Sequence, residues 1–197
     1  MKKGILLPVL AIVIMAGLVL GLTLGINDLA VKNAQAEHLK VMQTLLPGSK
    51  EFTVEPYDGE DANIRSVHKG ENGYVIETVT RGYAGDITML IGVSSEGKVT
   101  GLTIRDMTET PGLGMSAMWD WDFLGQFLGL EGGIAIGTAG EDAFSGATGS
   151  DTTETEVYID GISGATVTSK AIVRCVNSAV GYVTGADVDS GATSWGG

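Results

Sequence analysis

Cysteine is nearly absent from this sequence, and that scarcity excludes a disulfide scaffold. The 197 residues include one cysteine, Cys175, so no internal disulfide can form. It stands in the apolar run AIVRCVNSAV, where a buried, unreactive thiol is the expected state. One of the two histidines, His68, stands in RSVHKGENGY, which is typical of a loop. The potential metal ligands do not cluster along the sequence, so we expect no metal site.

Positive charge is also scarce. Lysine and arginine number 12 against 24 acidic residues, which gives a formal net charge of −12. Nucleic-acid binding needs a basic patch, so this balance excludes nucleic acid as a partner. Proline is rare at 4 residues while glycine reaches 30, which favours tight turns and close backbone contacts over a proline-rich linker. The length predicts one domain with attachments.

Charged residues are missing altogether between residues 4 and 26. As a helix, these residues would span about 34 Å, enough to cross a hydrocarbon core of about 30 Å. A cleaved signal peptide is the alternative, because AQA at residues 34–36 resembles a cleavage site, but its apolar core is typically about 7–15 residues long. Lys2 and Lys3 precede the span, so the N-terminus is expected in the cytoplasm and the rest outside.

The remaining pattern predicts an α+β domain built on an antiparallel sheet with flanking helices. Short runs rich in β-branched residues predict strands at 74–80, 86–94, 99–105 and 157–159. Apolar periodicity predicts helices over residues 115–130 and from Thr168 to about Val183. Trp119 and Trp121 are expected to fill the core, and stacking of one of them on a cofactor is the alternative. Residues 137–155 have the composition of an exposed loop. The expected organisation is a cytoplasmic end (1–3), a membrane helix (4–26), a linking helix ending at Pro47–Gly48 (27–48), the domain (49–183) and a tail (184–197).

The tetrapeptide SGAT occurs three times, at residues 145–148, 163–166 and 190–193, each with an aspartate three positions before its serine. Only the middle copy lies between a predicted strand and a predicted helix. A helix start offers free backbone N–H groups and the positive end of the helix dipole, worth about 0.3–1 kcal/mol to an anion. Thr168 and Ser169 are expected to cap the helix, beside the hydroxyl of Thr166. A helix cap without a ligand is the alternative that the residues themselves leave open.

The middle segment DGISGATVTS resembles the flavinylation motif of FMN-binding domains. The resemblance implies that FMN is joined through its phosphate to Thr166. The motif requires Ser or Thr three positions after that threonine, where this copy has Ser169 and the others have Asp151 and Gly196. The resemblance further assigns the surrounding motif residues to the cofactor site: Asp160, Ser163, Gly164, Ala165, Thr168 and Ser169.

A second segment, ETPGLG at residues 109–114, resembles that of the G subunit of Rnf complexes and of the C subunit of sodium-pumping NADH:quinone reductase. By this resemblance Glu109 also contacts the cofactor, and Thr110 hydrogen-bonds the polar edge of the flavin. Gly112 and Gly114 would let the backbone approach a flat ring, and Leu113 would cover its apolar edge.

Together the two segments imply an electron-carrying subunit that is not an enzyme by itself. Rnf complexes pass electrons between ferredoxin and NAD and couple this to sodium or proton translocation. The implied partners are the other membrane subunits of such a complex and a flavin transferase that uses FAD and magnesium. Two alternatives remain: the C subunit of the NADH:quinone reductase or another flavinylated extracytosolic carrier, and a membrane-anchored binding module without redox function.

Overall fold

The computed structural model describes residues 15, 30–137 and 157–186. It divides into two compact units, residues 1–41 and 42–197, and the second contains the sheet and the site. Apart from Met15, the predicted membrane segment 4–26 lies outside the described residues, as do the SGAT copies at 145–148 and 190–193. No helix in the described ranges is both long and apolar enough to cross a membrane.

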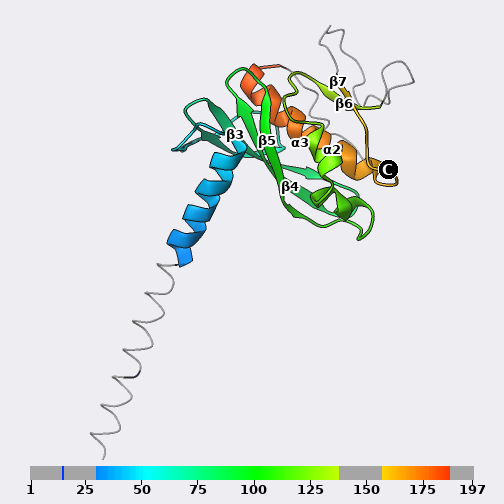
Figure 1. Ribbon diagram of the computed structural model, residues 1–197, viewed down its shortest axis with the longest axis horizontal. Helices are drawn as coiled ribbons and strands as arrows, with labels where there is room; N and C mark the ends of the chain where they lie inside the picture. Colours follow the sequence, from blue (N-terminus) through cyan, green and yellow to red (C-terminus); the bar gives the residue numbers. More distant parts are fainter. Residues whose placement is uncertain (1–14, 16–29, 138–156, 187–197) are drawn as a thin grey trace, which may run out of the picture. The chain divides into compact units, whose positions relative to one another are not determined.

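The described part of the second unit contains a five-stranded antiparallel sheet in which each strand pairs with the next along the chain (Figure 1). Its strands are β1 (Thr53–Glu55), β2 (Ile64–Lys69), β3 (Gly73–Arg81), β4 (Asp86–Ser94) and β5 (Val99–Met107). The predicted strands at 74–80, 86–94 and 99–105 are confirmed, as is the tight turn between the last two. His68 lies in β2, so its assignment to a loop is wrong.

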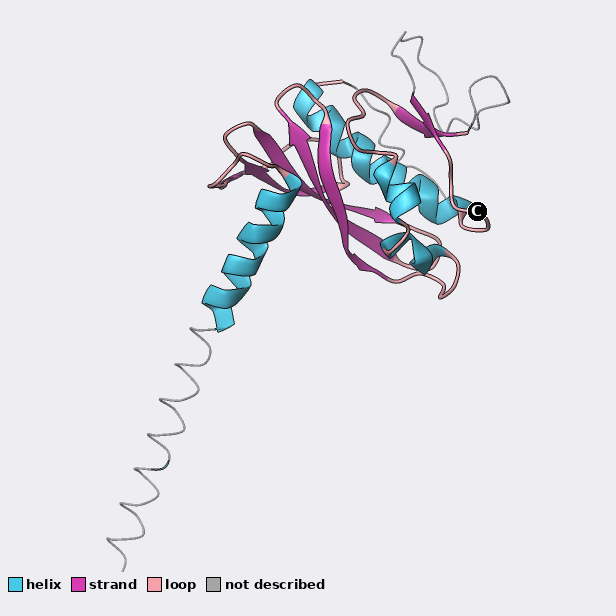
Figure 2. Ribbon diagram, in the orientation of Figure 1, coloured by secondary structure: helices cyan, strands magenta, loops and turns pink. Residues whose placement is uncertain are grey.

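One helix, α3 (Thr166–Thr184), packs against β3 and β4 and covers one face of this sheet (Figure 2). The alternation of β4 directs Ile87, Met89 and Ile91 to the same core as Ile172 and Val176 of α3. All five side chains are fully buried. Apolar burial of this kind stabilises by about 25 cal/mol per Å², so the helix–sheet contact contributes to the stability of the fold.

The other face of the sheet is approached closely by the end of the helix at residues 30–45. A Cβ atom added at Gly92 would lie 2.2 Å from the carbonyl oxygen of Leu45, and one at Gly101 would lie 2.9 Å from its Cα. Thr100 donates a hydrogen bond from Oγ1 to the same carbonyl. The paired glycines of β4 and β5 therefore make room for this backbone. The helix ends before Pro47, as expected.

A small parallel pair of strands, β6 (Ile134–Ile136) and β7 (Val157–Ile159), lies beside α3. Asn177 of α3 holds β6 as a neighbouring strand would: its Oδ1 accepts from the N–H of Ile134 at 3.0 Å and its Nδ2 donates to the carbonyl of the same residue at 2.9 Å. Strand β7 was expected, and it leads directly into the middle SGAT segment.

The helix predicted over residues 115–130 is divided into a 3-10 turn, η1 (Gly114–Met118), and the short α2 (Trp121–Gly125). Phe123 is buried as expected, but Trp119 and Trp121 are 65% and 73% exposed. The prediction that these two indoles fill the core is therefore wrong. The break at Asp120, whose carboxylate caps α2, turns both rings outward.

Cys175 is buried in the middle of α3, as predicted. Burial raises the pKa of its thiol to about 12, which leaves it protonated and unreactive at neutral pH.

Candidate functional site

The middle SGAT segment forms a tight turn between β7 and α3. The backbone N–H of Ala165 donates to the carbonyl of Ile162 at 3.0 Å. Gly164 has a φ of +77°, in the left-handed region that glycine adopts without steric cost. Ser163 and Gly164 are exposed, whereas Ala165 is buried. The turn thus presents its first two residues to solvent and anchors the third.

Ser169 closes this turn through its hydroxyl group. Its Oγ accepts from the N–H of Ile162 at 3.0 Å and donates to the carbonyl of Ala165 at 3.0 Å, and the side chain is fully buried. This pair of hydrogen bonds to the backbone gives a physical reason for Ser or Thr at this place in the motif. At the corresponding positions of the other two copies, Asp151 has a carboxylate that only accepts, and Gly196 has no side chain.

Helix α3 begins two residues earlier than predicted, so Thr166 is its first residue. Ala165 is its N-cap, and no side chain of the described residues caps this helix. Thr168 and Ser169 lie buried in the first turn, where their hydroxyls bond to Glu109 and to the SGAT turn. The prediction that these two side chains are N-caps is therefore wrong, because the Thr168 hydroxyl bonds to Glu109 and the Ser169 hydroxyl bonds within the SGAT turn.

The absence of a capping side chain among these residues leaves the start of α3 open toward solvent, where Thr166 is exposed. The first N–H groups of a helix have no partner within it, and the aligned peptide dipoles place partial positive charge there. A phosphate at this point would receive both the backbone donors and the dipole of a 19-residue helix. The hydroxyl of Thr166 lies at that same point.

Glu109 joins the ETPGLG loop to α3 and to the loop between β3 and β4. The residue is 4% exposed; its Oε2 accepts from Thr168 Oγ1 at 2.9 Å and its Oε1 from the N–H of Ala84 at 3.1 Å. Hydrogen bonds to a charged acceptor contribute about 1.5–3 kcal/mol each. Sequence reasoning assigned Glu109 to the cofactor, whereas here both of its oxygens bind protein donors.

Gly114 is the point at which the two motifs come closest. A Cβ atom there would lie 2.4 Å from Thr168 Oγ1 and 2.7 Å from Glu109 Oε2. Any side chain would therefore separate Glu109 from Thr168. Gly114 therefore meets a packing requirement between protein atoms, and the expectation that it lets the backbone approach a flat ring stays a prediction.

The rest of the ETPGLG loop faces outward. Gly112 has a φ of +77°, and no described atom lies within 4 Å of a Cβ built there. Leu113 is 46% exposed, and its Cδ2 lies 3.3 Å from a Cβ built on Gly164 of the SGAT turn. The half-buried Thr110 accepts through its carbonyl from the N–H groups of Leu113 and Met115 at 3.1 and 3.2 Å. An exposed leucine and an open glycine thus adjoin the SGAT turn.

Gln126, just after α2, holds the chain where it enters the site, and sequence reasoning missed it. The N–H of Asp160 donates to Gln126 Oε1 at 2.8 Å, and Gln126 Nε2 donates to the Asp160 carbonyl at 3.2 Å. This pair of bonds fixes the backbone while the Asp160 side chain stays exposed. The one feature of the sequence that could have indicated this role is that Gln126 is the single polar side chain in the run FLGQFLGL.

The fold and the site together define a small α+β domain that presents a threonine hydroxyl at the start of a long helix. A family model of the FMN-binding domain matches residues 82–181. This range contains both motifs and about half of the chain, and the chain belongs to the FMN-binding domain family. The predicted membership is confirmed.

Relatives of known name are subunits of ion-translocating complexes. The chain is 31% identical over 193 residues to the G subunit of the ion-translocating oxidoreductase complex of Methanosarcina acetivorans, covering 91% of this chain and 93% of the relative. It is 37% identical over 111 residues to the G subunit of the Na⁺-translocating ferredoxin:NAD⁺ oxidoreductase complex of Acetobacterium woodii, and the match covers 55% of this chain and 47% of the relative. The chain therefore spans about half the length of that second relative.

Among solved structures, the chain is similar to the C subunit of the Na⁺-translocating NADH-quinone reductase of Parabacteroides distasonis. The identity is 25%, the TM-score is 0.42, and the match covers 66% of this chain and 62% of that one.

The residues present fit the phosphate and the ring of FMN by their chemistry. The start of α3 supplies uncapped backbone donors and a hydroxyl, which suit a phosphate. Beside them, the exposed Leu113 offers apolar surface, and Gly112 leaves space that a Cβ would fill. These elements come from segments more than 50 residues apart in the sequence, and the bond between Glu109 and Thr168 holds them together.

Proposed function

We propose that this chain is a membrane-anchored electron-transfer subunit of an Rnf-type complex, with FMN attached covalently to Thr166 through its phosphate. The observation that carries the proposal is the position of Thr166: exposed, first in α3, and beside the ETPGLG loop that Glu109 ties to the same helix. Membership in the FMN-binding domain family and the names of the relatives support it.

Attachment at Thr166 is a phosphoryl-type transfer that a flavin transferase would carry out with FAD and magnesium. The Thr166 oxygen forms a bond to the phosphorus of the FMN half, the pyrophosphate bond breaks, AMP leaves and the hydroxyl proton is released. No electrons change hands in this step. The chain contributes an accessible hydroxyl, a turn whose shape is fixed by Gly164 and Ser169, and backbone donors that favour the phosphate. The exposed carboxylate of Asp160 serves the transferase or the approach of its metal.

Bound FMN supplies one-electron and two-electron redox chemistry, while the protein sets its position and surroundings. We assign Leu113 to the apolar edge of the ring and the open backbone at Gly112 to its face. Thr110, whose carbonyl is already bonded to the loop, would act through its side chain at the polar edge. Covalent attachment keeps the cofactor in place outside the cytoplasm, where lost flavin cannot be replaced.

The proposed organisation follows the order of features along the chain. Residues 1–3 are cytoplasmic, 4–26 form a single membrane helix and 27–48 a linking helix, with the FMN-binding domain at 49–183 on the extracytoplasmic side and a tail at 184–197. The relatives support the membrane complex, because both are named as subunits of ion-translocating oxidoreductases. We propose the other membrane subunits of such a complex as partners.

The test is flavin fluorescence on a denaturing gel, with the protein produced together with a flavin transferase. The wild-type chain should give a fluorescent band because a covalent bond survives denaturation. Thr166→Val should abolish the band, whereas Thr148→Val and Thr193→Val should retain it. A dark wild-type band would contradict covalent attachment and favour a non-redox binding module. Loss of fluorescence with either control would place the flavin on another threonine.

A second candidate keeps the flavin but changes the complex to a sodium-pumping NADH:quinone reductase. The ETPGLG segment favours this candidate as well, because it resembles both the G subunit of Rnf complexes and the C subunit of the quinone reductase. Purification of the chain from its native membrane with mild detergent would separate the candidates. Recovery with the subunits of a ferredoxin:NAD⁺ oxidoreductase is expected, and recovery with those of a quinone reductase would favour the alternative.

A further inference from the structure

The exposed aromatic side chains of the described residues gather on segments that border the candidate site. Trp119, Trp121 and Tyr83 are 65%, 73% and 70% exposed. Tyr83 belongs to the loop in which the N–H of Ala84 binds Glu109. At the far end of α3, by contrast, tyrosine rings pack edge to face against one another. The exposed rings therefore lie beside the site rather than being scattered over the domain.

The 3-10 turn η1 places Trp119 on the same side as the exposed Leu113. The N–H of Ser116 donates to the Leu113 carbonyl and that of Trp119 to the Ser116 carbonyl, both at 3.0 Å. Side chains three residues apart eclipse in a 3-10 helix, which rises about 2 Å per residue, so Trp119 lies about 12 Å from Leu113 along one side. Leu113 in turn lies against Gly164. One side of η1 thus leads from the SGAT turn to the indoles.

Trp119 and Trp121 together form what we call the indole patch. The N–H of Trp121 donates to the Trp119 carbonyl at 3.1 Å, so both rings leave the chain at one turn. A buried aromatic side chain removes about 150–250 Å² from water, so at their exposures the two rings leave roughly 300 Å² open. Apolar patches of about 300–600 Å² on a monomer are often functional, and tryptophan is enriched at the centres of protein interfaces. The indole patch therefore has the size and composition of a docking surface.

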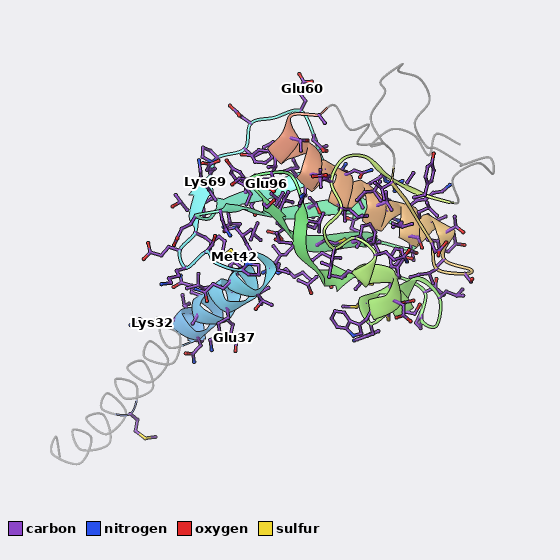
Figure 3. All side chains as sticks on the ribbon, turned by 45° about the horizontal axis from the view of Figure 1, so that its top comes forward. Lys32, Glu37, Met42, Glu60, Lys69 and Glu96 are labelled. Carbon is purple, nitrogen blue, oxygen red and sulfur yellow. The ribbon has the colours of Figure 1, made fainter. Side chains whose placement is uncertain are left out.

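The sequence around the indole patch contains no positive charge. Between residues 106 and 169 there are eleven acidic residues and no lysine or arginine. Asp120 caps α2 between the two indoles, and Asp122 is exposed next to them. Lys69, labelled in Figure 3, lies on β2, well away from η1 and α2. The patch is therefore an apolar centre with an acidic border.

We infer that the indole patch docks another protein subunit of the complex, one whose facing surface has an apolar pocket bordered by lysine and arginine. The inference rests on the proposed function, which makes this chain one subunit of such a complex. An acidic border attracts a basic protein surface, whereas it is repelled by the anionic headgroups of a membrane. Arg105, which precedes the acidic stretch, is paired with Glu77 at 3.3 Å and does not face a partner alone.

Docking at the indole patch would bring this partner close to the proposed flavin. Leu113, which we assigned to the apolar edge of the ring, lies on the same side of η1 as Trp119. Electrons pass between cofactors only over short distances. The position therefore suits the subunit that exchanges electrons with the flavin.

The test is a titration of the full-length chain in detergent into the remaining subunits of its complex, purified from cells that lack this chain. The double variant Trp119→Ser with Trp121→Ser should raise the apparent Kd at least about thirtyfold, because aromatic side chains at an interface centre contribute most of the binding energy. Val54→Ser is the matched control, since it removes an equally exposed apolar side chain from β1. It should change the Kd by less than about twofold.

A second pair of variants tests the acidic border. Asp122→Lys should raise the Kd about fivefold at low salt and weaken its dependence on salt, because a basic partner then meets a like charge. Asp58→Lys makes the same change in net charge in the exposed loop before β2 and should leave the Kd unaltered. A wild-type Kd in both the indole double variant and Asp122→Lys would overturn the inference.

Cross-linking identifies what covers the patch in the assembled complex. A photoreactive benzophenone side chain in place of Trp121 should cross-link to another protein subunit, at a peptide that contains lysine or arginine. Cross-links to lipid alone, or to a second copy of this chain, would overturn the inference.

Flavin uptake separates this inference from the proposed function. The indole double variant should take up covalent flavin at the wild-type rate and show the wild-type flavin absorption spectrum. A slower uptake would assign the patch to the flavin transferase, and an altered spectrum of the isolated variant would place an indole on the flavin; either result overturns the inference. If the wild type takes up no flavin, the proposed attachment fails, while the Kd values still test docking.

Discussion

The SGAT turn and the ETPGLG loop meet at the start of α3, yet they hold their polar groups in opposite ways. In the ETPGLG loop the carboxylate of Glu109 is buried and bonded on both oxygens. In the SGAT turn the hydroxyl of Thr166 is exposed at an uncapped helix end. In the proposed function the first motif therefore supplies the support and the second the reactive hydroxyl, although both resemble cofactor-binding sequences.

Each motif also contains both kinds of residue, those bonded to the protein and those exposed to solvent. Ser169 and Thr168 follow Thr166, the proposed acceptor, within three residues, but both hydroxyls bond to the protein itself. Leu113, within the loop that Glu109 anchors, is half exposed. Substitutions can therefore distinguish residues that hold the site from residues proposed to contact the flavin.

The largest expected effect is on the support. Glu109→Ala should lower the free energy of unfolding of the flavin-free protein by about 3 kcal/mol, because the N–H of Ala84 and the Thr168 hydroxyl lose a charged acceptor. Urea denaturation measures this loss. Thr166→Val, at an exposed position, should stay within about 0.5 kcal/mol of the wild type. Equal losses of the free energy of unfolding in the two variants would contradict the distinction between a supporting residue and an exposed reactive one.

A smaller loss is expected where the support touches the reactive turn. Ser169→Ala removes both bonds that close the SGAT turn and should cost about 2 kcal/mol, while also slowing flavin attachment. Ser178→Ala is the matched control. This buried serine lies further along α3, away from the SGAT turn, and accepts a hydrogen bond from Asn63. It should cost stability without changing the attachment rate, measured as fluorescence gained over time. An unchanged rate in Ser169→Ala would show that the turn does not depend on this hydroxyl.

The smallest effect is expected at the entrance of the site. Gln126→Ala removes two partly exposed bonds to the backbone of Asp160, worth about 1 kcal/mol together. The Asp160 amide should then exchange its proton about fivefold faster, as measured by NMR hydrogen exchange. Gln43→Ala, which removes an exposed bond to the Lys50 carbonyl, should leave that amide unchanged. Unaltered exchange in Gln126→Ala would mean that β7 holds Asp160 without help.

Much of the fold could be predicted from the sequence where local pattern and tertiary environment agree. Strands β3 to β5 alternate with short turns, and α3 has a continuous apolar face, so each was recognised. Strand β2 was missed because IRSVHK contains only two apolar residues. Strand β6 pairs in parallel with a segment more than 20 residues away and is held by Asn177. The local sequence around β6 indicates neither contact.

The site was predictable in its location but not in its internal division of roles. The motifs identified both segments, yet the letters did not show that Glu109 and Thr168 bond to each other. Thr168 and Ser169 do not cap α3, which begins at Thr166, because their hydroxyls bond to Glu109 and within the SGAT turn. Trp119 and Trp121 were misplaced because apolar periodicity does not reveal a break between two short helices.

The central claim is that the hydroxyl of Thr166 carries the flavin. Mass spectrometry with peptide fragmentation tests it most directly on protein produced with a flavin transferase. Because Thr148 and Thr166 share a tryptic peptide, the fragment ions must separate them. The expected result is one FMN, less water, on Thr166 and none on Thr148 or Thr193. An unmodified Thr166, or a flavin on either of the other two threonines, would contradict the claim.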